Sequence, residues 1–290
     1  MYEITEADYQ HWREHGYVIV RVLDDKELES ALDNVHRYFP SWDEFDHDRW
    51  RYDNLTVRRA FPFVDDALNH VAMHPKLLAF AERVLETQRI ILGHSILIAK
   101  YAGTLDYEQQ LHTDYMNNTL AYPRPDTQIF DLPVITYYTD VTVDLGPTYL
   151  VPQEHTRERT LVPARYGRED DPELYRHERP MTLSAGSTLI YSMNTFHRGS
   201  AMKATAGHRY SHHVTFTRAD MPWAGQVTFQ HEGGRPEMDH FLQWATPRQR
   251  ELVGFPPVGD PYWDDVTIAG VGARYPQMDM EPYQAARVDR

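Results

Sequence analysis

The sequence predicts a mainly β protein in which flanking helices pack against a β-sandwich or barrel. Amphipathic stretches with helical spacing occupy the chain up to Glu86. From Arg89 onward the sequence changes to short segments rich in Ile, Val, Thr and Tyr, separated by Gly, Pro or Asp. Helices that precede a long run of strands are typical of a sheet protein with its helices on the outside. A chain of 290 residues can form one large β domain, and we expect residues 1–290 to be that single domain.

The N-terminal region is expected to contain a helix, a strand and two further helices. Thr5 to Glu14 form the first helix, with Thr5 as its N-cap and Gly16 near its end. The apolar run "GYVIVRVL" predicts a buried strand. In "DDKELESALDNVHRYF" the large apolar side chains recur at helical spacing, which predicts an amphipathic helix. These side chains are Leu28, Leu32, Val35 and Phe39. The stretch "NHVAMHPKLLAFAERVLE" predicts one more amphipathic helix.

Several later segments carry strand signals. They are "RIILGHSILIAKY", "VITYYTDVTV", "PTYLVPQEH", "STLIYSM" and "RYSHHVTFTR". A further helix is predicted in "EMDHFLQWATPRQRELVG". From Phe255 the chain is rich in Pro, Trp and Tyr, which favours an ordered, aromatic-rich C-terminal tail that wraps around the body.

The composition excludes several classes of function. The chain has no cysteine, which excludes a disulfide framework, a thiolate zinc site, an iron–sulfur cluster and a cysteine nucleophile. The formal net charge of −14 repels a phosphate backbone and argues against a nucleic-acid partner. The N-terminus shows no hydrophobic signal core, and the longest apolar runs are too short to span a membrane. We therefore expect a cytoplasmic protein without a membrane partner.

The segment "QQLHTDYMNN" places His112 and Asp114 two positions apart. In a strand, residues i and i+2 point to the same side of the sheet, so both side chains could reach one metal ion. Two ligands alone hold a metal weakly. A second histidine from a distant strand would complete a triad that suits iron(II) and oxygen chemistry. The pair is equally compatible with an ordinary strand, so other parts of the sequence must decide.

A downstream segment supplies the missing groups. His197 follows the strand signal "STLIYSM", and Arg209 begins the next strand. If His197 is the third ligand, the adjoining strand could carry Arg209 into the same cavity, where its guanidinium would match a carboxylate bidentately. 2-Oxoglutarate is a dicarboxylate that could chelate the metal at one end and meet Arg209 at the other. Ser211 lies on the same strand face and could add a hydroxyl. The alternative for Arg209 is an ordinary surface position on the strand.

Three further histidines lie in "HRYSHHVTF". His212 and His213 face opposite ways in a strand, so they cannot easily share an ion. We expect structural or surface roles for these two residues and for His208.

Taken in order, these segments resemble the phytanoyl-CoA dioxygenase family of iron(II)/2-oxoglutarate-dependent oxygenases. "QQLHTDY" is similar to the family's Gln-x-x-His-x-Asp segment, with Gln109, His112 and Asp114 at the matching positions. "LSAGSTLIYSMNTFHRGS" resembles its Gly-Asp, strand, His-x-x-Ser segment. "GHRYSHHVTF" resembles the strand that begins at the 2-oxoglutarate arginine. The N-terminal helix, strand and helix resemble the opening of the family, so the resemblance covers most of the chain.

The sequence departs from the family's pattern at three motifs. Its counterparts of Asn-Gly-Pro, Pro-Gly-Ser-His and Gly-Asp are Leu145-Gly146-Pro147, Pro152-Gln153-Glu154-His155 and Gly186-Ser187. The three metal-ligand positions are intact. The departures leave the substrate undefined.

The resemblance implies a double-stranded β-helix, which is a cupin-like jelly-roll barrel, with Fe(II) bound by His112, Asp114 and His197. Asp114 argues against halogenation, because family halogenases replace the acidic ligand with a small residue. The implied activity is that of a dioxygenase that uses molecular oxygen to hydroxylate a small-molecule metabolite. Two alternatives remain, a cupin-like metalloenzyme that acts without 2-oxoglutarate and a non-catalytic binding protein of the same fold.

The resemblance also implies how the co-substrate is held. Arg209 would bind the distal carboxylate of 2-oxoglutarate, with Ser211 and Gln109 assisting, and decarboxylation would yield succinate. The segment from Tyr115 to Asp131 is long for a connection inside a compact domain, which is typical of a functional loop. We expect it to cover the site, with Tyr115 and Tyr122 as candidate substrate contacts.

Overall fold

The computed structural model describes most of the chain. The described residues are 3–52, 58–64, 66–104, 108–114, 129–159, 165–220 and 236–287.

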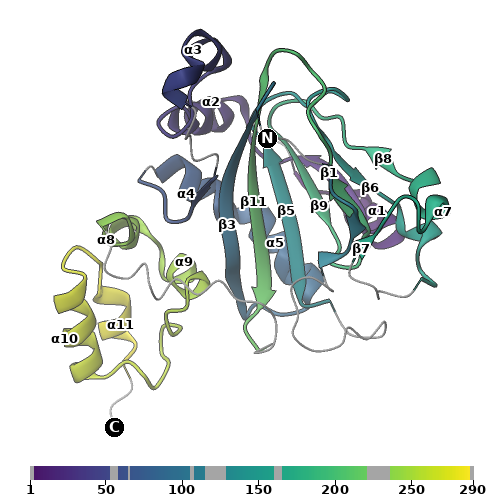
Figure 1. The fold of residues 1–290 in the computed structure, drawn as a ribbon. Coiled ribbons are helices and arrows are strands. Elements are labelled where there is room, and N and C mark those ends of the chain that lie inside the picture. Colours follow the sequence, from purple (N-terminus) through teal and green to yellow (C-terminus); the bar gives the residue numbers. More distant parts are fainter. Residues whose placement is uncertain are drawn as a thin grey trace.

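Two antiparallel sheets face each other and form the body of the molecule (Figure 1). The larger sheet contains β1 (Tyr17–Arg21), β2 (Arg58–Ala60), β3 (Ile90–Tyr101), β5 (Asp131–Tyr137), β9 (Ser187–Tyr191) and β11 (His208–Arg218). Its strand order is β1-β9-β5-β11-β3-β2. The smaller sheet contains β4 (Leu111–His112), β6 (Thr148–Leu150), β7 (Arg165–Tyr166), β8 (Arg179–Pro180) and β10 (His197–Gly199). Its order is β7-β4-β10-β6-β8, and this pair of sheets is the predicted double-stranded β-helix.

The first helix forms where the sequence predicts it. Helix α1 (Glu6–His15) begins after Thr5, whose side chain accepts from the backbone N–H of Asp8 in a capping box. It ends at Gly16, which adopts a left-handed φ of 76°. The strand β1 that follows is only half buried, because it is the edge strand of its sheet: Ile19 is 40% exposed.

The predicted helix in "NHVAMHPKLLAFAERVLE" is two helices. Helix α4 (Asp66–Ala72) stops before His74, and α5 (Pro75–Leu85) begins at the proline. A proline disfavours the helical conformation of the residue before it. His74 accordingly has an extended backbone and caps α5. The single helix predicted in "EMDHFLQWATPRQRELVG" is divided in the same way into α8 (Pro236–Trp244) and α9 (Pro247–Leu252), since Thr246 caps α9 just before Pro247.

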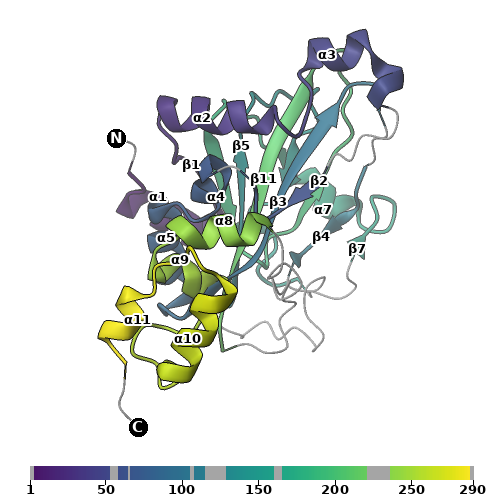
Figure 2. The ribbon, with the colours of Figure 1, turned by 90° about the vertical axis from the view of Figure 1, so that its left-hand side faces the viewer.

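Helices cover the outer face of the larger sheet (Figure 2). They are α1, α2 (Asp25–Val35), α4, α5, α8 and α9. The even-numbered side chains of β5 and β11, such as Val134 and Phe216, pack against these helices. The odd-numbered ones therefore point between the two sheets. The remaining short helices are α3 (Trp42–His47), η1 (Arg49–Tyr52), η2 (Gln153–His155) and α7 (Pro172–Arg176).

The C-terminal region differs from the expected wrapping tail. It folds into two helices, α10 (Asp265–Arg274) and α11 (Glu281–Ala285), which lie beside α8 and α9 at one end of the molecule (Figure 1). Its aromatic side chains are used inside this cluster: Trp263 and Tyr283 are fully buried, with ring centroids 4.1 Å apart. In the described part of the chain, no helix combines the length and the apolar character needed to cross a lipid bilayer.

Candidate metal centre and active site

His112, Asp114 and His197 converge between the two sheets. Each offers one potential ligand atom, and these atoms all lie within 4.8 Å of one another. His112 ends β4 and His197 begins β10, and their Cα atoms are direct cross-strand partners. The two imidazole centroids are consequently only 4.5 Å apart. Residues 85 positions apart in the chain are thus held side by side by strand pairing.

Asp114 reaches the same point by a different route from the one predicted. The strand expected to carry both residues ends at His112, and Asp114 lies beyond it. Its carboxylate nevertheless turns toward the histidines, with Oδ1 3.7 Å from Nε2 of His197. The hydroxyl of Tyr191, which lies at the end of β9 in the facing sheet, donates a 3.0 Å hydrogen bond to the other oxygen, Oδ2.

Backbone contacts fix the tautomers of both histidines. Nδ1 of His112 lies 2.9 Å from the carbonyl oxygen of Gln110, and Nδ1 of His197 lies 3.0 Å from that of Thr195. A carbonyl oxygen can only accept, so Nδ1 donates in each ring and Nε2 keeps its lone pair. Burial, with a further contribution from His197, lowers the pKa of His112 to about 4. His112 is therefore uncharged at neutral pH, as a metal ligand must be.

A cavity of about 290 Å³ lies beside these three residues, between the two sheets. Arg209 lines this cavity and is only 5% exposed. Its guanidinium donates to the carbonyl oxygen of Gly146. Lys100, the cross-strand partner of Arg209 on β3, lines the same cavity. Like charges on opposed strand positions are unfavourable unless an anion lies between them, so this end of the cavity suits a carboxylate.

Gln109 and Ser211, the other two residues predicted to bind the co-substrate, differ in whether they line the cavity. Gln109 lines the cavity, and its Oε1 accepts a 2.7 Å hydrogen bond from the N–H of Gly199 on β10. Ser211 shares the inward face of β11 with Arg209 but is fully buried and is not part of the cavity wall. Its hydroxyl lies 3.2 Å from Nε2 of His213.

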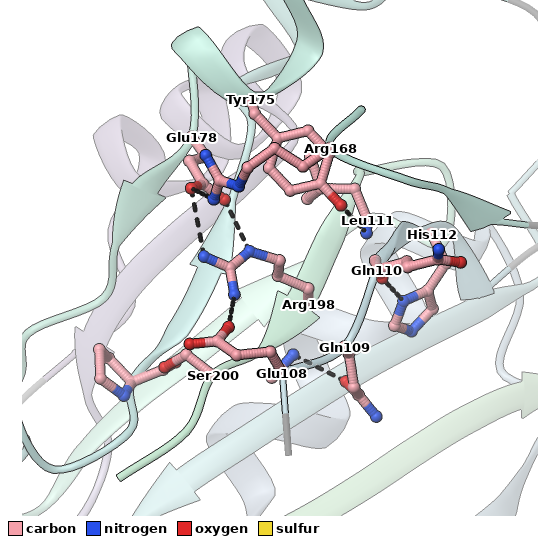
Figure 3. A network of polar contacts seen from close by, with 12 residues as sticks. Glu108, Gln109, Gln110, Leu111, His112, Arg168, Tyr175, Glu178, Arg198 and Ser200 are labelled. Carbon is pink, nitrogen blue, oxygen red and sulfur yellow. Dashed lines mark hydrogen bonds and ion pairs between the residues drawn. The ribbon is translucent and has the colours of Figure 1, made fainter. Parts of the chain in front are cut away.

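Arg198, the neighbour of His197 and the obvious alternative to Arg209, points away from the cavity. Figure 3 shows its guanidinium between Glu178 and Glu108. Nε of Arg198 lies 2.7 Å from Glu178, and the guanidinium stacks over the ring of Tyr149 at 4.4 Å. Successive strand residues face opposite sides, so a ligand-forming His197 requires an outward Arg198.

Several residues that line the cavity are not identified as such from the sequence, and three of them lie close to charged or ligand-forming groups. These three are His94, Tyr191 and His213. His213, expected to be structural or on the surface, shares the inward face of β11 with Arg209, and the alternation rule could have found it. His212 faces the helices, where Ser95 and Tyr138 hydrogen-bond its two ring nitrogens. His94 and Tyr191 carry no such local signal, because their place depends on how the strands pair.

Tyr115 and Tyr122, with most of the segment predicted to cover the site, lie outside the described residues.

Comparison with known proteins now decides the family. A model of the phytanoyl-CoA dioxygenase (PhyH) family matches residues 12–209, which contain His112, Asp114 and His197 and end at Arg209. The chain belongs to the phytanoyl-CoA dioxygenase family. No curated protein matches this family member by sequence at a significant level.

Several solved structures share this fold. The non-heme alpha ketoglutarate dependent carbocyclase SnoK from nogalamycin biosynthesis is 19% identical, with a TM-score of 0.55 over 79% of this chain and 89% of SnoK. The epimerase SnoN, in complex with Fe³⁺, alpha ketoglutarate and nogalamycin RO, is 20% identical, with a TM-score of 0.53 over 74% and 83%. HygX from Streptomyces hygroscopicus, with nickel, 2-oxoglutarate and hygromycin B bound, is 15% identical, with a TM-score of 0.53 over 77% and 96%. At these identities the likeness establishes a shared fold.

Proposed function

We propose that this phytanoyl-CoA dioxygenase family member is an iron(II)- and 2-oxoglutarate-dependent oxygenase that acts on a small molecule. The observation that carries the proposal is the convergence of His112, Asp114 and His197 on one point beside a cavity. Two imidazoles and one carboxylate leave open coordination positions and suit iron(II) with oxygen. The SnoN and HygX complexes, which hold a metal together with 2-oxoglutarate, support this assignment.

The donor set fits such a metal without rearrangement of the tautomers. His112 and His197 present Nε2, because Nδ1 of each is engaged by a backbone carbonyl. Asp114 presents Oδ1, because Tyr191 already occupies Oδ2. Iron(II) and 2-oxoglutarate together supply the oxidative chemistry, in which decarboxylation to succinate is coupled to oxidation of the substrate.

Arg209 would hold the distal carboxylate of 2-oxoglutarate. It is buried, it lines the cavity, and its planar guanidinium can bind a carboxylate through two parallel hydrogen bonds. Gln109 would lie against the same molecule, since it is a wall residue clamped to β10. Ser211 would act only through His213, behind the wall.

We further propose hydroxylation as the outcome, with molecular oxygen as the second co-substrate. The similar structures do not restrict the reaction to hydroxylation, since SnoK is described as a carbocyclase and SnoN as an epimerase. The buried arginine in the cavity argues against a cupin-like enzyme that acts without 2-oxoglutarate. The three converging metal ligands argue against a non-catalytic binding protein. A cytoplasmic location stays a prediction.

Binding measurements test the two halves of the proposal separately. Calorimetric titration of the metal-free protein with Ni(II), and then with 2-oxoglutarate, should show one site for each. His112→Ala should abolish metal binding while the circular dichroism spectrum stays unchanged. Arg209→Lys should weaken 2-oxoglutarate binding by about tenfold or more, because lysine loses the bidentate geometry. The matched variant Arg198→Lys should leave that affinity within about twofold, since Arg198 lies outside the cavity.

Turnover is the final test. Purified protein incubated in air with iron(II), 2-oxoglutarate and a panel of natural-product, amino-acid and amino-sugar candidates should form succinate together with a new product mass. A protein that binds neither metal nor 2-oxoglutarate would refute the proposed function.

A further inference from the structure

One end of the space between the sheets is polar where an ordinary core would be apolar. The inward positions of β3, β5 and β11 carry Ile96, Ile98 and Ile135 near the middle of the strands. Nearer the other end of β11 they carry His94, Thr215, Thr217 and Asp131. We call these four residues the polar corner.

Strand pairing places the four side chains on two adjacent rungs of the sheet. Thr215 lies between His94 on β3 and Pro133 on β5, and all three line the cavity. Thr217 pairs with Asp131 on the next rung, two residues further along the same face. The polar corner therefore begins in the cavity wall and continues by about 7 Å along the strands.

Asp131 lacks a counter-charge, and the hydroxyl of Thr217 is its hydrogen-bonding neighbour among the described residues. Asp131 is 3% exposed, and its Oδ1 is buried without a hydrogen-bond donor. No Lys or Arg among the described residues forms an ion pair with it, and the described charge that acts on its pKa is the like charge of Asp114. The hydroxyl of Thr217 beside it is buried and has no hydrogen-bond partner other than Asp131. Buried polar atoms of this kind are uncommon and call for a ligand or another specific explanation.

Gly93 packs directly against the polar corner. A Cβ atom built on Gly93 would lie 2.5 Å from the hydroxyl oxygen of Thr217. Any larger residue would displace that hydroxyl, so the backbone of β3 is shaped around it.

The corner also lies within electrostatic reach of the metal ligands. Burial raises the pKa of Asp131, and the carboxylate of Asp114 adds to this effect. The same carboxylate partly opposes the lowering of the pKa of His94 that burial causes. A molecule bound at the corner would therefore lie near the triad. The cations that line the cavity, Arg209, Lys100 and Arg58, are all on other rungs, whereas Asp131 lies at the corner, one rung beyond the cavity wall.

We propose that the polar corner is the substrate-recognition end of the cavity and that it selects a hydroxyl-rich molecule carrying a protonated amine. Asp131 pairs with the amine, whose positive charge offsets the cost of burying the carboxylate. His94, Thr215 and Thr217 exchange hydrogen bonds with the hydroxyl groups. That the bound molecule is a substrate rests on the proposed oxygenase function, whereas the preference for a protonated amine does not.

Glucosamine and glucose form a matched pair of probes, because they differ by an amine in place of one hydroxyl. Their dissociation constants are measured by ligand-observed NMR on the protein loaded with Ni(II) and 2-oxoglutarate. Wild-type protein should bind glucosamine about tenfold more tightly than glucose, the size expected for a charge-assisted hydrogen bond. Asp131→Asn should erase this preference while it leaves the binding of glucose unchanged.

Two further variants make the result specific. Asp140→Asn is the matched control, because Asp140 is an exposed aspartate just past the other end of β5, and it should keep the tenfold preference. His94→Leu should weaken both sugars equally, since it removes a hydrogen-bonding group without removing charge. Thermal unfolding and 2-oxoglutarate affinity, measured on each variant, confirm that the protein is folded and loaded.

The proposal is overturned if the wild-type protein binds neither sugar, if it binds both equally, or if Asp131→Asn keeps the preference. The failure of the recognition proposal can be distinguished from the failure of the proposed oxygenase function. Loss of metal or 2-oxoglutarate binding with an intact, Asp131-dependent preference for glucosamine would sink the oxygenase function and leave the recognition site standing.

Discussion

Tyr191 forms a hydrogen bond between the two sheets, and this bond determines which carboxylate oxygen of Asp114 can bind a metal. Its hydroxyl donates to Oδ2 of Asp114, which leaves Oδ1 on the side of His197. The ring also lies against His197, with centroids 4.6 Å apart. Hydrogen bonds from neighbouring groups commonly orient metal ligands in this way. We therefore regard Tyr191 as a positioning residue for one-oxygen ligation by Asp114.

Tyr191→Phe should weaken Ni(II) and Co(II) binding by about 10- to 100-fold, because Asp114 loses the donor that orients it. The visible spectrum of bound Co(II), which reports coordination geometry, should change as well. Tyr138→Phe is the control. It removes another buried phenol hydroxyl, and the partner of that hydroxyl is His212, which is not a metal ligand. Equal metal affinity in the two variants would show that Tyr191 merely fills space.

Asp131 should make the stability of the protein depend on pH in an unusual direction. Burial, with a further contribution from Asp114, raises the pKa of Asp131 from 3.8 to about 7. Between these values the folded state retains a proton that the unfolded state has released, so this residue's contribution to stability falls as the pH rises from about 4 to about 7. Asp131→Asn abolishes this effect.

Urea unfolding of wild-type protein and Asp131→Asn at several pH values measures the difference. The two should have similar free energies of unfolding near pH 4, and the variant should become more stable by roughly 1–3 kcal/mol near pH 8. Asp140→Asn should show no such trend. A constant difference between wild type and Asp131→Asn at every pH would contradict the raised pKa.

At the scale of single elements, strand alternation was the most informative property of the sequence. It places Arg209 and His213 inward and His212 outward on β11, as the structure does. It could not show that β4 ends at His112, because a strand of two residues is too short to leave a periodic pattern. It could not find Tyr191 either, since the contact of Tyr191 with Asp114 is made between two different sheets.

The boundary between α4 and α5 shows that the restriction imposed by a proline can end a helix where the apolar periodicity continues. Apolar spacing continues through His74 and Pro75, so periodicity alone predicts one helix there. The restriction that a proline places on the preceding residue ends α4 and starts α5. Local backbone chemistry therefore decides helix ends, while periodicity decides which face is buried.

The short strands of the smaller sheet depend on a buried ion-pair network. Glu178, next to β8, receives hydrogen bonds from Arg198 on β10 and from Arg168 beyond β7 (Figure 3). Both members of the central pair are buried, with Arg198 5% exposed. Glu178→Gln should lower the free energy of unfolding by about 3 kcal/mol, because the buried guanidinium loses its buried counter-charge and keeps only the half-exposed Glu108.

The exposed pair between Glu173 and Arg176 provides the comparison. Glu173→Gln should cost less than about 1 kcal/mol in the same urea titration, as surface ion pairs usually do. Similar losses for Glu173→Gln and Glu178→Gln would mean that burial does not strengthen the network.

At the scale of the whole molecule, one hydrophobic cluster runs from Trp12 in α1 to Tyr283 in α11. The family and the jelly-roll body follow from the order of motifs, which is preserved along the sequence. The helical C-terminal region does not, because its aromatic residues bury one another and show no clear period. Phe241 connects the two parts: it is fully buried, and its ring lies 5.0 Å from that of Phe61.

We expect the chain to unfold as a single domain because of this shared cluster. Phe241→Ala should lower the free energy of unfolding by about 3–5 kcal/mol, and tryptophan fluorescence and circular dichroism should still report one coincident transition. Val266→Ala, at a position that is 79% exposed on α10, should have little effect. Two separate transitions in either variant would show that the C-terminal helices form a domain of their own.

The cross-strand pairing of His112 with His197 has a consequence beyond chemistry. A metal held by both would act as a reversible cross-link that closes a loop of about 85 residues, much as a disulfide does by restricting the unfolded chain. The protein has no cysteine, so no disulfide can play that part. Metal supply would then set how long each molecule survives in the cell as well as whether it can turn over.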